Sequence, residues 1–302
     1  MTAPRLPGKG LDFRKSANNA DSLEACPQNR QESTEGLCIT DTRVIEASVL
    51  AALNLHAMEA KSDTSVDPGT DVIEVRRLSK HYDDVAALSD VSFSIRENEI
   101  LGIIGPNGSG KTTLMECLAG FIAPDSGQVR LRGQQLPLSR RREILFYLPD
   151  GIAPFGDLTV GRVLFIQARL HGRPASALGS VVEALALAPA WHKPVTALSK
   201  GYRRRLLLAL ALVAPQRVLL LDEPFDGFDL RQTLAVVKLL REVVQHRTLV
   251  LSIHQIADAE RICDRFLLLG AGRVLACGSL DTLCEQAGAA RRSLEEVFLA
   301  LT

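Results

Sequence analysis

No apolar run in this sequence is long enough to cross a lipid bilayer. The longest extends from Leu206 to Pro215, whereas a transmembrane helix needs about 18 or more consecutive apolar residues. The first residues also lack the apolar core of a secretory signal, and Asp12, Asp21 and Glu24 argue against a mitochondrial presequence. We therefore expect that, if the protein works at a membrane, a separate chain anchors it.

An excess of charge of either sign is also missing. The chain has 35 basic and 35 acidic residues without a block of like charge, so we expect neither nucleic acid nor an acidic membrane surface as a partner. The cysteines form no C-x-x-C pair and none of the paired spacings of zinc sites, which favours a reduced, cytosolic compartment. They are Cys26, Cys38, Cys117, Cys263, Cys277 and Cys284.

Aromatic residues make up only 5% of the chain and are absent between Phe13 and Tyr82. Residues 1–70 are instead rich in Pro, Gly, Ser, Asn and Asp, which is typical of a largely disordered extension. Within it, Arg43 to Ala60 has apolar residues at helical spacing. We interpret this segment as a transient helix in a tail, since so few aromatic residues are present to form a core.

From Asp71 onward the pattern indicates a folded α/β domain, and an apolar content of 46% is enough for a large core. Nearly continuous Val, Leu and Ile runs alternate with helical segments, which predicts a parallel sheet covered by helices. The expected strands are 72–75, 91–95, 100–104, 129–132, 218–221, 248–253 and 266–269. Ala- and Leu-rich periodicity without a strand predicts an inserted helical subdomain at about 147–213.

The segment from Gly105 to Thr112 reads Gly-Pro-Asn-Gly-Ser-Gly-Lys-Thr and matches the phosphate-binding pattern G-x-x-x-x-G-K-[ST]. It follows the strand-like run 100–104 and precedes the helical run 113–119, as the motif requires. Glycines let backbone N–H groups turn around phosphate oxygens, and the helix that follows presents its positive end to them. The expected phosphate contacts are Gly105, Pro106, Asn107, Gly108, Ser109, Gly110, Lys111, Thr112 and Thr113, with the Thr112 hydroxyl also on Mg²⁺.

Two carboxylates, Asp222 and Glu223, end the buried run Val218-Leu-Leu-Leu. Ligands of open α/β sheets lie at the carboxyl ends of the strands. Without other signals, two exposed acids at a strand end would be the preferred interpretation. The phosphate-binding pattern at 105–112 instead favours a metal-binding role for Asp222 and a general-base role for Glu223. His254 follows another apolar run and is placed to sense the γ-phosphate of ATP.

The segment Leu198-Ser-Lys-Gly-Tyr202 lies ahead of an Arg- and Leu-rich helical run and resembles the signature motif of ABC-transporter ATP-binding subunits. Ser199 is also a good helix N-cap on its own account. In that family the signature of one subunit closes over ATP bound by another. The resemblance therefore implies that Ser199, Lys200 and Gly201 act in trans, with the helix dipole facing the γ-phosphate.

Further matches to this family run along the chain. Tyr82 resembles the aromatic residue that stacks on adenine, Asp229 resembles the D-loop aspartate, and His254 resembles the H-switch. The ending 293–302 is similar to that of drug-exporter-like subunits whose membrane partner is a separate polypeptide. The resemblance covers residues 71–302.

Three positions depart from the family pattern. Asp150 stands where most members have the Q-loop glutamine, Tyr202 replaces the signature glutamine, and Lys200 replaces a glycine. A carboxylate at position 150 is a candidate Mg²⁺ ligand, but it also adds negative charge near the triphosphate. Our hypothesis is that Lys200 partly offsets the charge of Asp150.

The resemblance implies a P-loop NTPase (RecA-like) core with a small antiparallel β subdomain near 71–96 and the helical insertion. It further implies an ATPase that binds ATP and Mg²⁺ and pairs with a second nucleotide-binding domain, which we expect to be a second copy of this chain in a homodimer. This dimer is expected to drive a separate transmembrane permease in the export direction. Such a subunit is cytoplasmic and peripheral to the membrane. The alternatives are a soluble ABC ATPase acting on nucleic acid or ribosomes, an ATP-binding regulator without turnover, and a kinase or GTPase.

Overall fold

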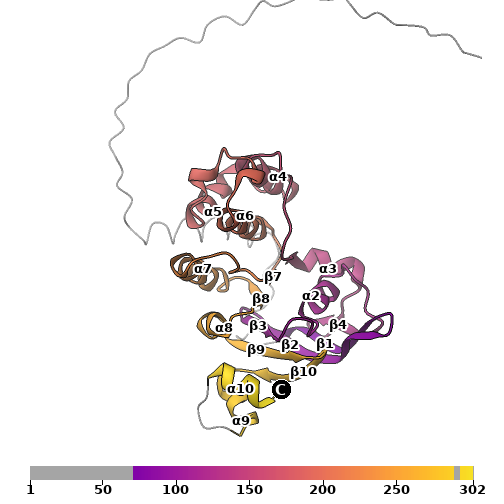
Figure 1. Cartoon of the computed structure of the whole chain (residues 1–302). Helices are drawn as coiled ribbons and strands as arrows, with labels where there is room; N and C mark the ends of the chain where they lie inside the picture. Colours follow the sequence, from indigo (N-terminus) through magenta and orange to yellow (C-terminus); the bar gives the residue numbers. More distant parts are fainter. Residues whose placement is uncertain (1–70, 289–292, 302) are drawn as a thin grey trace, which may run out of the picture. The chain divides into compact units, whose positions relative to one another are not determined.

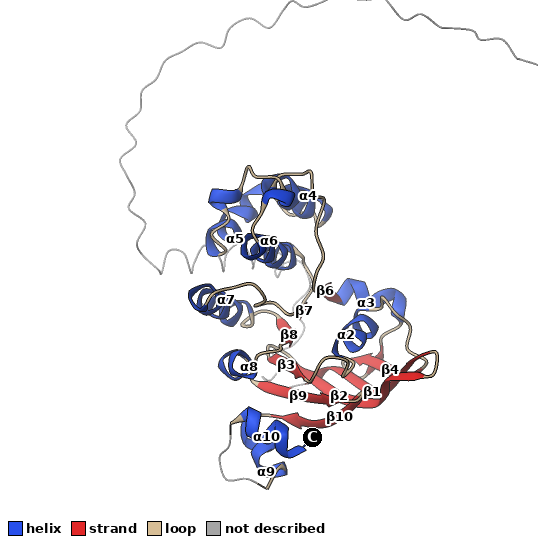
Figure 2. Ribbon diagram, in the orientation of Figure 1, coloured by secondary structure: helices blue, strands red, loops and turns tan. Residues whose placement is uncertain are grey.

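The computed structural model describes residues 71–288 and 293–301 (Figure 1). The predicted extension 1–70, with its helix from Arg43 to Ala60, lies outside the described residues. The described strands form two sheets, one four-stranded and one six-stranded, with helices packed on them (Figure 2).

The four-stranded sheet has the order β2-β1-β4-β5 and is antiparallel. Its strands are β1 (Asp71–Tyr82), β2 (Val85–Arg96), β4 (Ser126–Leu131) and β5 (Gln134–Gln135). β1 and β2 form a hairpin whose turn includes Asp83 with a positive φ of 50°, a conformation that aspartate tolerates better than most residues. The β subdomain therefore includes β4 and β5 and is larger than the predicted segment 71–96.

The six-stranded sheet has the order β10-β9-β3-β8-β7-β6. Its first five strands in the chain are parallel, and β10 pairs antiparallel with β9 at one edge. Every residue of β3, β7 and β8 is buried, as expected for parallel strands covered on both faces. The strands are β3 (Ile100–Ile104), β6 (Leu145–Leu148), β7 (Val218–Asp222), β8 (Thr248–Ser252), β9 (Arg265–Gly270) and β10 (Arg273–Gly278).

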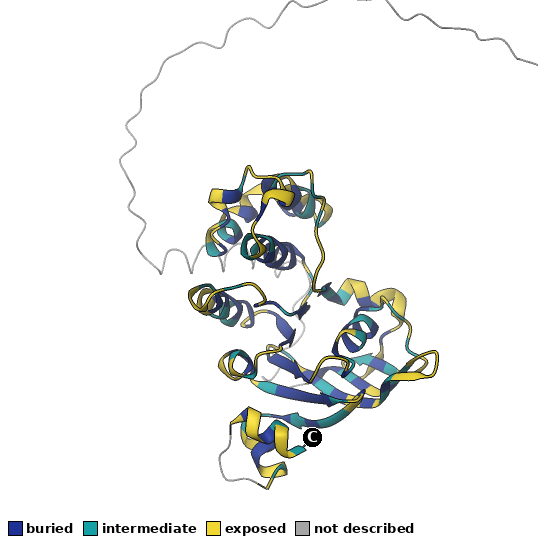
Figure 3. Ribbon diagram, in the orientation of Figure 1, coloured by how far each residue is buried: buried dark blue, intermediate teal, exposed yellow. Residues whose placement is uncertain are grey.

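Helices cover both faces of the six-stranded sheet, and two buried clusters result (Figure 3). One cluster contains buried residues of α2, such as Leu114 and Met115, together with residues of both sheets. The other joins the opposite face of the sheet to α6 and α7. The helices outside the insertion are α2 (Lys111–Ala119), α3 (Leu138–Ile144), α7 (Leu230–Val243), α8 (Ile256–Ile262), α9 (Leu280–Gln286) and α10 (Leu294–Leu301).

The helical insertion lies between β6 and β7. Its α-helices are α4 (Val160–Leu170), α5 (Leu178–Ala184) and α6 (Lys200–Val213), with 3₁₀ turns at Ala175–Ala177, Ala188–Ala190 and Val195–Ala197. The first helix begins at Val160 and not near Tyr147, because Leu145–Leu148 pair with β7 in the sheet. Within the described residues, no helix combines the length and the apolar character needed to span a membrane.

Candidate functional site

Three loops meet where β3, β7 and β8 end. The glycine-rich loop follows β3, Asp222 and Glu223 end and follow β7, and His254 follows β8. Since these strands are parallel and adjacent, their carboxyl ends lie at one edge of the sheet. A pocket of about 320 Å³ lies there, and it is lined by Val85, Ala86, Ala87, Asn107, Gly108, Gly110, Lys111, Thr112, Thr113, Asp150, Asp222, Glu223 and His254.

The glycines of the loop are required by geometry. Gly108 and Gly110 have φ values of 79° and 100°, a region that other residues rarely adopt. A Cβ on Gly105 would lie 2.2 Å from the carbonyl oxygen of Leu269, which is closer than any real contact. The loop therefore keeps its turn, with α2 beginning directly at Lys111 so that the helix N-terminus faces the pocket.

Lys111 is buried and its ammonium group lies against the loop. Nζ donates hydrogen bonds to the carbonyl oxygens of Gly105 at 2.7 Å and Pro106 at 3.0 Å. Burial lowers the pKa of Lys111, while the nearby carboxylates of Glu223 and Asp222 raise it. The lysine thus brings a positive charge to a site that otherwise holds several acids.

Asp222 carries the oxygens that a metal would use. Thr112 Oγ1 donates a hydrogen bond to Asp222 Oδ2 at 3.3 Å, and the Tyr147 hydroxyl donates to the same oxygen at 3.4 Å. Burial and then Asp222 raise the pKa of Tyr147, so its hydroxyl remains a donor. Hydroxyl and carboxylate oxygens are the ligand type that Mg²⁺ prefers.

No group of three or more His, Cys, Asp and Glu side chains that could hold a metal exists in residues 71–288 and 293–301. A cation beside Thr112 and Asp222 would therefore complete its coordination with phosphate and water oxygens, which is how Mg²⁺ commonly binds at nucleotide sites. The residues present fit a metal that arrives with a nucleotide.

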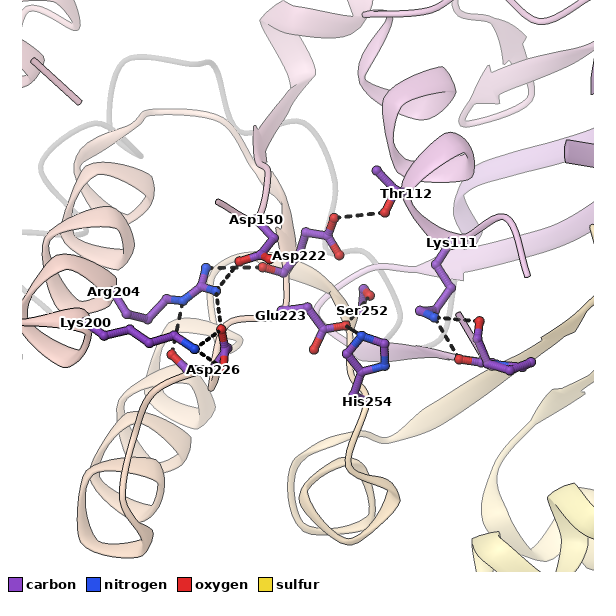
Figure 4. A network of polar contacts seen from close by, with 12 residues as sticks. Lys111, Thr112, Asp150, Lys200, Arg204, Asp222, Glu223, Asp226, Ser252 and His254 are labelled. Carbon is purple, nitrogen blue, oxygen red and sulfur yellow. Dashed lines mark hydrogen bonds and ion pairs between the residues drawn. The ribbon is translucent and has the colours of Figure 1, made fainter. Parts of the chain in front are cut away.

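Glu223 is held by two neighbours, as Figure 4 shows. Ser252 Oγ donates a hydrogen bond to Oε1 at 3.2 Å, and His254 Nε2 lies 3.2 Å from the same oxygen. Burial raises the pKa of Glu223, and His254 opposes this shift. The backbone φ of Glu223 is 51°, a costly conformation for a non-glycine residue that often marks functional sites.

Glu223→Gln is expected to raise the melting temperature of the protein alone at neutral pH. The carboxyl binds its proton more tightly in the folded protein than at its usual pKa of 4.5. Its contribution to stability is therefore complete below that value and is lost as the pH rises through the higher, folded-state pKa. Glutamine cannot ionise, so the difference in melting temperature should widen as the pH rises above 4.5. Melting curves across this pH range test this, and a difference that is constant with pH contradicts it.

Tyr82 ends β1 and is 43% exposed. Its ring lies beneath the ammonium of Lys80, 5.7 Å from the ring centroid, and Lys80 in turn pairs with Asp125 at 2.9 Å. The pocket is lined by Val85 to Ala87 of the neighbouring strand but not by Tyr82 itself. The exposed ring is thus available as a flat apolar surface close to, but outside, the phosphate pocket.

Ser199 is exposed and caps α6, accepting a hydrogen bond from the Tyr202 N–H at 3.4 Å. Lys200 and Gly201 follow in the first turn, and none of these three residues lines the pocket of its own chain. Asp229 likewise caps α7, with its Oδ1 accepting from the Gln232 N–H at 2.8 Å. The signature residues therefore present a helix N-terminus outward.

Within one chain, Lys200 does not pair with Asp150, so the hypothesis that it offsets the charge of Asp150 stays a prediction for a site shared between two copies. Lys200 Nζ pairs with Asp226, 2.8 Å away, and the cation beside Asp150 is Arg204, whose Nη2 lies 2.5 Å from Oδ1. Arg204 is one turn further along α6 and buried, so it reaches the sheet edge that the exposed Lys200 does not (Figure 4).

Arg204, Ser252 and Tyr147 contact the site but were not singled out from the sequence. Arg204 lies in the Arg-rich run after the signature, and Ser252 lies two residues before His254. A polar residue within an otherwise apolar strand, as Ser252 is, was the available signal, since such a residue needs a hydrogen-bond partner when buried.

Known proteins resemble this chain in sequence and fold. A family model described as ABC transporter matches residues 88–226. An uncharacterised ABC transporter ATP-binding protein of Bacillus subtilis (strain 168), YxlF, is 34% identical over 71% of this chain and 73% of its own length. Nod factor export ATP-binding protein I of Ralstonia nicotianae is 34% identical over 69% of this chain and 67% of its own.

A solved structure of the ATP-binding subunit of an ABC transporter superposes with a TM-score of 0.71 at 28% identity, covering 76% of this chain and 99% of its own. This match confirms the expected α/β P-loop fold. The chain therefore belongs to the ATP-binding subunits of ABC transporters, which are nucleotide-binding ATPases.

Proposed function

We propose that this subunit binds Mg²⁺-ATP at the pocket between the glycine-rich loop and Glu223 and hydrolyses it there. The observation that carries this proposal is the convergence of Lys111, Thr112, Asp222, Glu223 and His254 on one pocket. Loop N–H groups and Lys111 would bind the phosphates. Mg²⁺, held through Thr112 and Asp222, would neutralise charge on the β- and γ-phosphates.

Glu223 would orient the attacking water and accept its proton. Burial raises its pKa, which suits a base that works near neutral pH. Ser252 and His254 would keep the carboxylate in place through their 3.2 Å contacts, and the exposed edge of the His254 ring would face the γ-phosphate. Positioned charge, and not covalent catalysis, would provide the rate enhancement.

A second copy of the chain would complete each site. Ser199, Lys200 and Gly201 lie outside their own chain's pocket, and the N-terminus of α6 carries a partial positive charge that suits a phosphate. In the proposed dimer this helix end would cap the triphosphate held by the partner, Tyr82 would stack on adenine, and Asp229 would lie at the interface.

The dimer would drive a separate membrane subunit from the cytoplasmic side of the membrane. The relatives named for Nod factor export favour movement out of the cell, and the helical insertion with the Asp150 loop would contact the membrane subunit. Opening and closing of the dimer would then transmit the work of hydrolysis.

The purified chain is expected to release phosphate from ATP only when Mg²⁺ is present. Because two copies would form each site, specific activity should rise with protein concentration as monomers pair. Phosphate release measured over a dilution series, with and without EDTA, tests both points. If the chain binds ATP but releases no phosphate, the proposed hydrolysis is wrong. If the specific activity stays constant at dilutions where the chain is monomeric, the site is not shared between two copies.

A further inference from the structure

Asp150 lines three pockets, among them the pocket at the glycine-rich loop and one against α6. Its half-exposed side chain lines the 320 Å³ pocket with Thr112 and Asp222, and it also lines a pocket of about 280 Å³ against α6 with Arg204. Figure 4 shows it between Asp222 and Arg204. One carboxylate therefore borders both the phosphate cradle and the helix that begins at the signature residues.

Arg204 is the fixed member of this ion pair. Its side chain is only 5% exposed, and besides Asp150 it donates Nη1 to the Asp222 carbonyl oxygen at 3.4 Å and Nε to the Asp226 carbonyl oxygen at 3.5 Å. A planar guanidinium held at three points has little freedom to move. Asp150, 48% exposed and followed by Gly151 with a φ of 72°, has room to turn toward either pocket.

Lys200, which lines the same α6 pocket as Asp150, does not compete with Arg204 for that carboxylate. Lys200 is 70% exposed on its side chain and contacts both oxygens of Asp226, at 2.9 and 2.8 Å. Arg204 Nη2 is 3.8 Å from the same Asp226 carboxylate, so Lys200 satisfies most of that acid. The charge of Arg204 is then left mainly for Asp150.

We propose that Arg204 is a positioning residue that holds the Asp150 carboxylate on the α6 side, and that Mg²⁺ at the nucleotide pocket competes with it for that carboxylate. This inference rests on the proposed nucleotide site. Taking Asp150 away leaves a buried guanidinium with incomplete charge compensation, which is costly. Metal binding by Asp150 and the attachment of α6 to the sheet edge therefore oppose each other, and this links the metal to the position of the signature helix.

The test measures the dissociation constant of ATP with Mg²⁺ and with EDTA in the full chain. The variants are Arg204→Gln, Asp150→Asn and the double variant. The ratio of interest is the dissociation constant in EDTA divided by that in Mg²⁺. A freed Asp150 carboxylate should repel metal-free ATP and should help to hold Mg²⁺ when the metal is present. Arg204→Gln should therefore raise this ratio about tenfold. In the Asp150→Asn background the same arginine change should move the ratio less than about twofold, because the carboxylate it controls is absent.

Arg205→Gln is the matched control. It removes the same charge from the next residue of α6, whose guanidinium lies 5.2 Å from the Tyr202 ring and has no contact with Asp150, and it should leave the ratio unchanged. Arg204→Lys keeps the positive charge but loses the planar guanidinium group, so it should shift the ratio in the same direction by less than Arg204→Gln does. If circular dichroism shows that Arg204→Gln is unfolded, Arg204→Lys is used for the test instead.

The inference is overturned if Arg204→Gln changes the ratio equally in the wild-type and Asp150→Asn backgrounds. It is also overturned if Arg204→Gln leaves the ratio unchanged. Either result leaves the proposed ATP site intact if the wild-type chain binds Mg²⁺-ATP. If the wild-type chain binds no ATP under either condition, the proposed function itself is wrong and the inference falls with it.

Discussion

Glu223→Gln is expected to lower the rate of ATP hydrolysis by about 10²–10⁴-fold, the usual contribution of a general base, while ATP binding is retained. The amide keeps the shape of the side chain and can still contact Ser252 and His254, which lie 3.2 Å from Oε1 in the wild-type protein. It cannot accept the proton of the attacking water. Phosphate release and ATP affinity measured on the same preparation test both parts.

The same variant should accumulate as an ATP-bound dimer, because hydrolysis is the step that would release the two copies. Size-exclusion chromatography at saturating ATP measures this directly, and a monomer under these conditions would contradict the shared site. Glu143→Gln is the matched control: Glu143 is exposed and pairs with Arg140 at 3.3 Å, so the same chemical change there should alter neither turnover nor assembly.

Lys111→Ala is expected to weaken ATP binding by at least about 10²-fold, because the proposed charge-assisted contact of this buried lysine with phosphate would be lost. The loss should be specific to this position, since Nζ lies against the glycine loop. Lys193→Ala removes an exposed lysine of the helical insertion and should leave the affinity unchanged. Calorimetric titration with ATP measures the two constants.

Mixing Lys111→Ala with Ser199→Arg distinguishes a site shared between two copies from one within a single chain. Each variant alone should be nearly inactive, one for lack of a phosphate contact and the other because a bulky side chain blocks the cap. In a mixed dimer, one site combines the intact loop of one copy with the intact helix cap of the other, so about a quarter to a half of the wild-type activity should return. Absence of any recovery, with mixed dimers present, argues for a site built within one chain.

The strands of the sheet centre were predictable because their signal is local. Ile100–Ile104 was predicted with the bounds observed, and the runs at β7 and β8 were placed within one or two residues. These segments are buried on both faces, so they consist mostly of apolar residues and are easily recognised in the sequence. Strands β6 and β10 were not predicted: β6 has only four residues, and β10 is an edge strand with a partly exposed face.

The membership of the four-stranded sheet was harder to predict than its strands. β1 pairs with β4 although two strands and a helix lie between them in the chain, as in the pairing of Val75 with Val129. Such a pairing depends on which apolar faces meet in three dimensions, and alternation along one strand carries no information about its neighbour. The predicted β subdomain therefore stopped at Arg96, although the sheet includes residues up to Gln135.

The residues of the site also differ in how far the sequence could predict their roles. Lys111, Asp222 and Ser199 occur in short patterns whose chemistry is contained in adjacent residues, so order along the chain was enough to propose their roles. The partners of the departing residues were decided only on folding: Arg204 contacts Asp150 from 54 positions away, and Lys200 contacts Asp226 from 26. An ion pair needs a distance of a few ångströms, and only the packing of α6 on the sheet edge determines which of two neighbouring cations comes within that distance of Asp150.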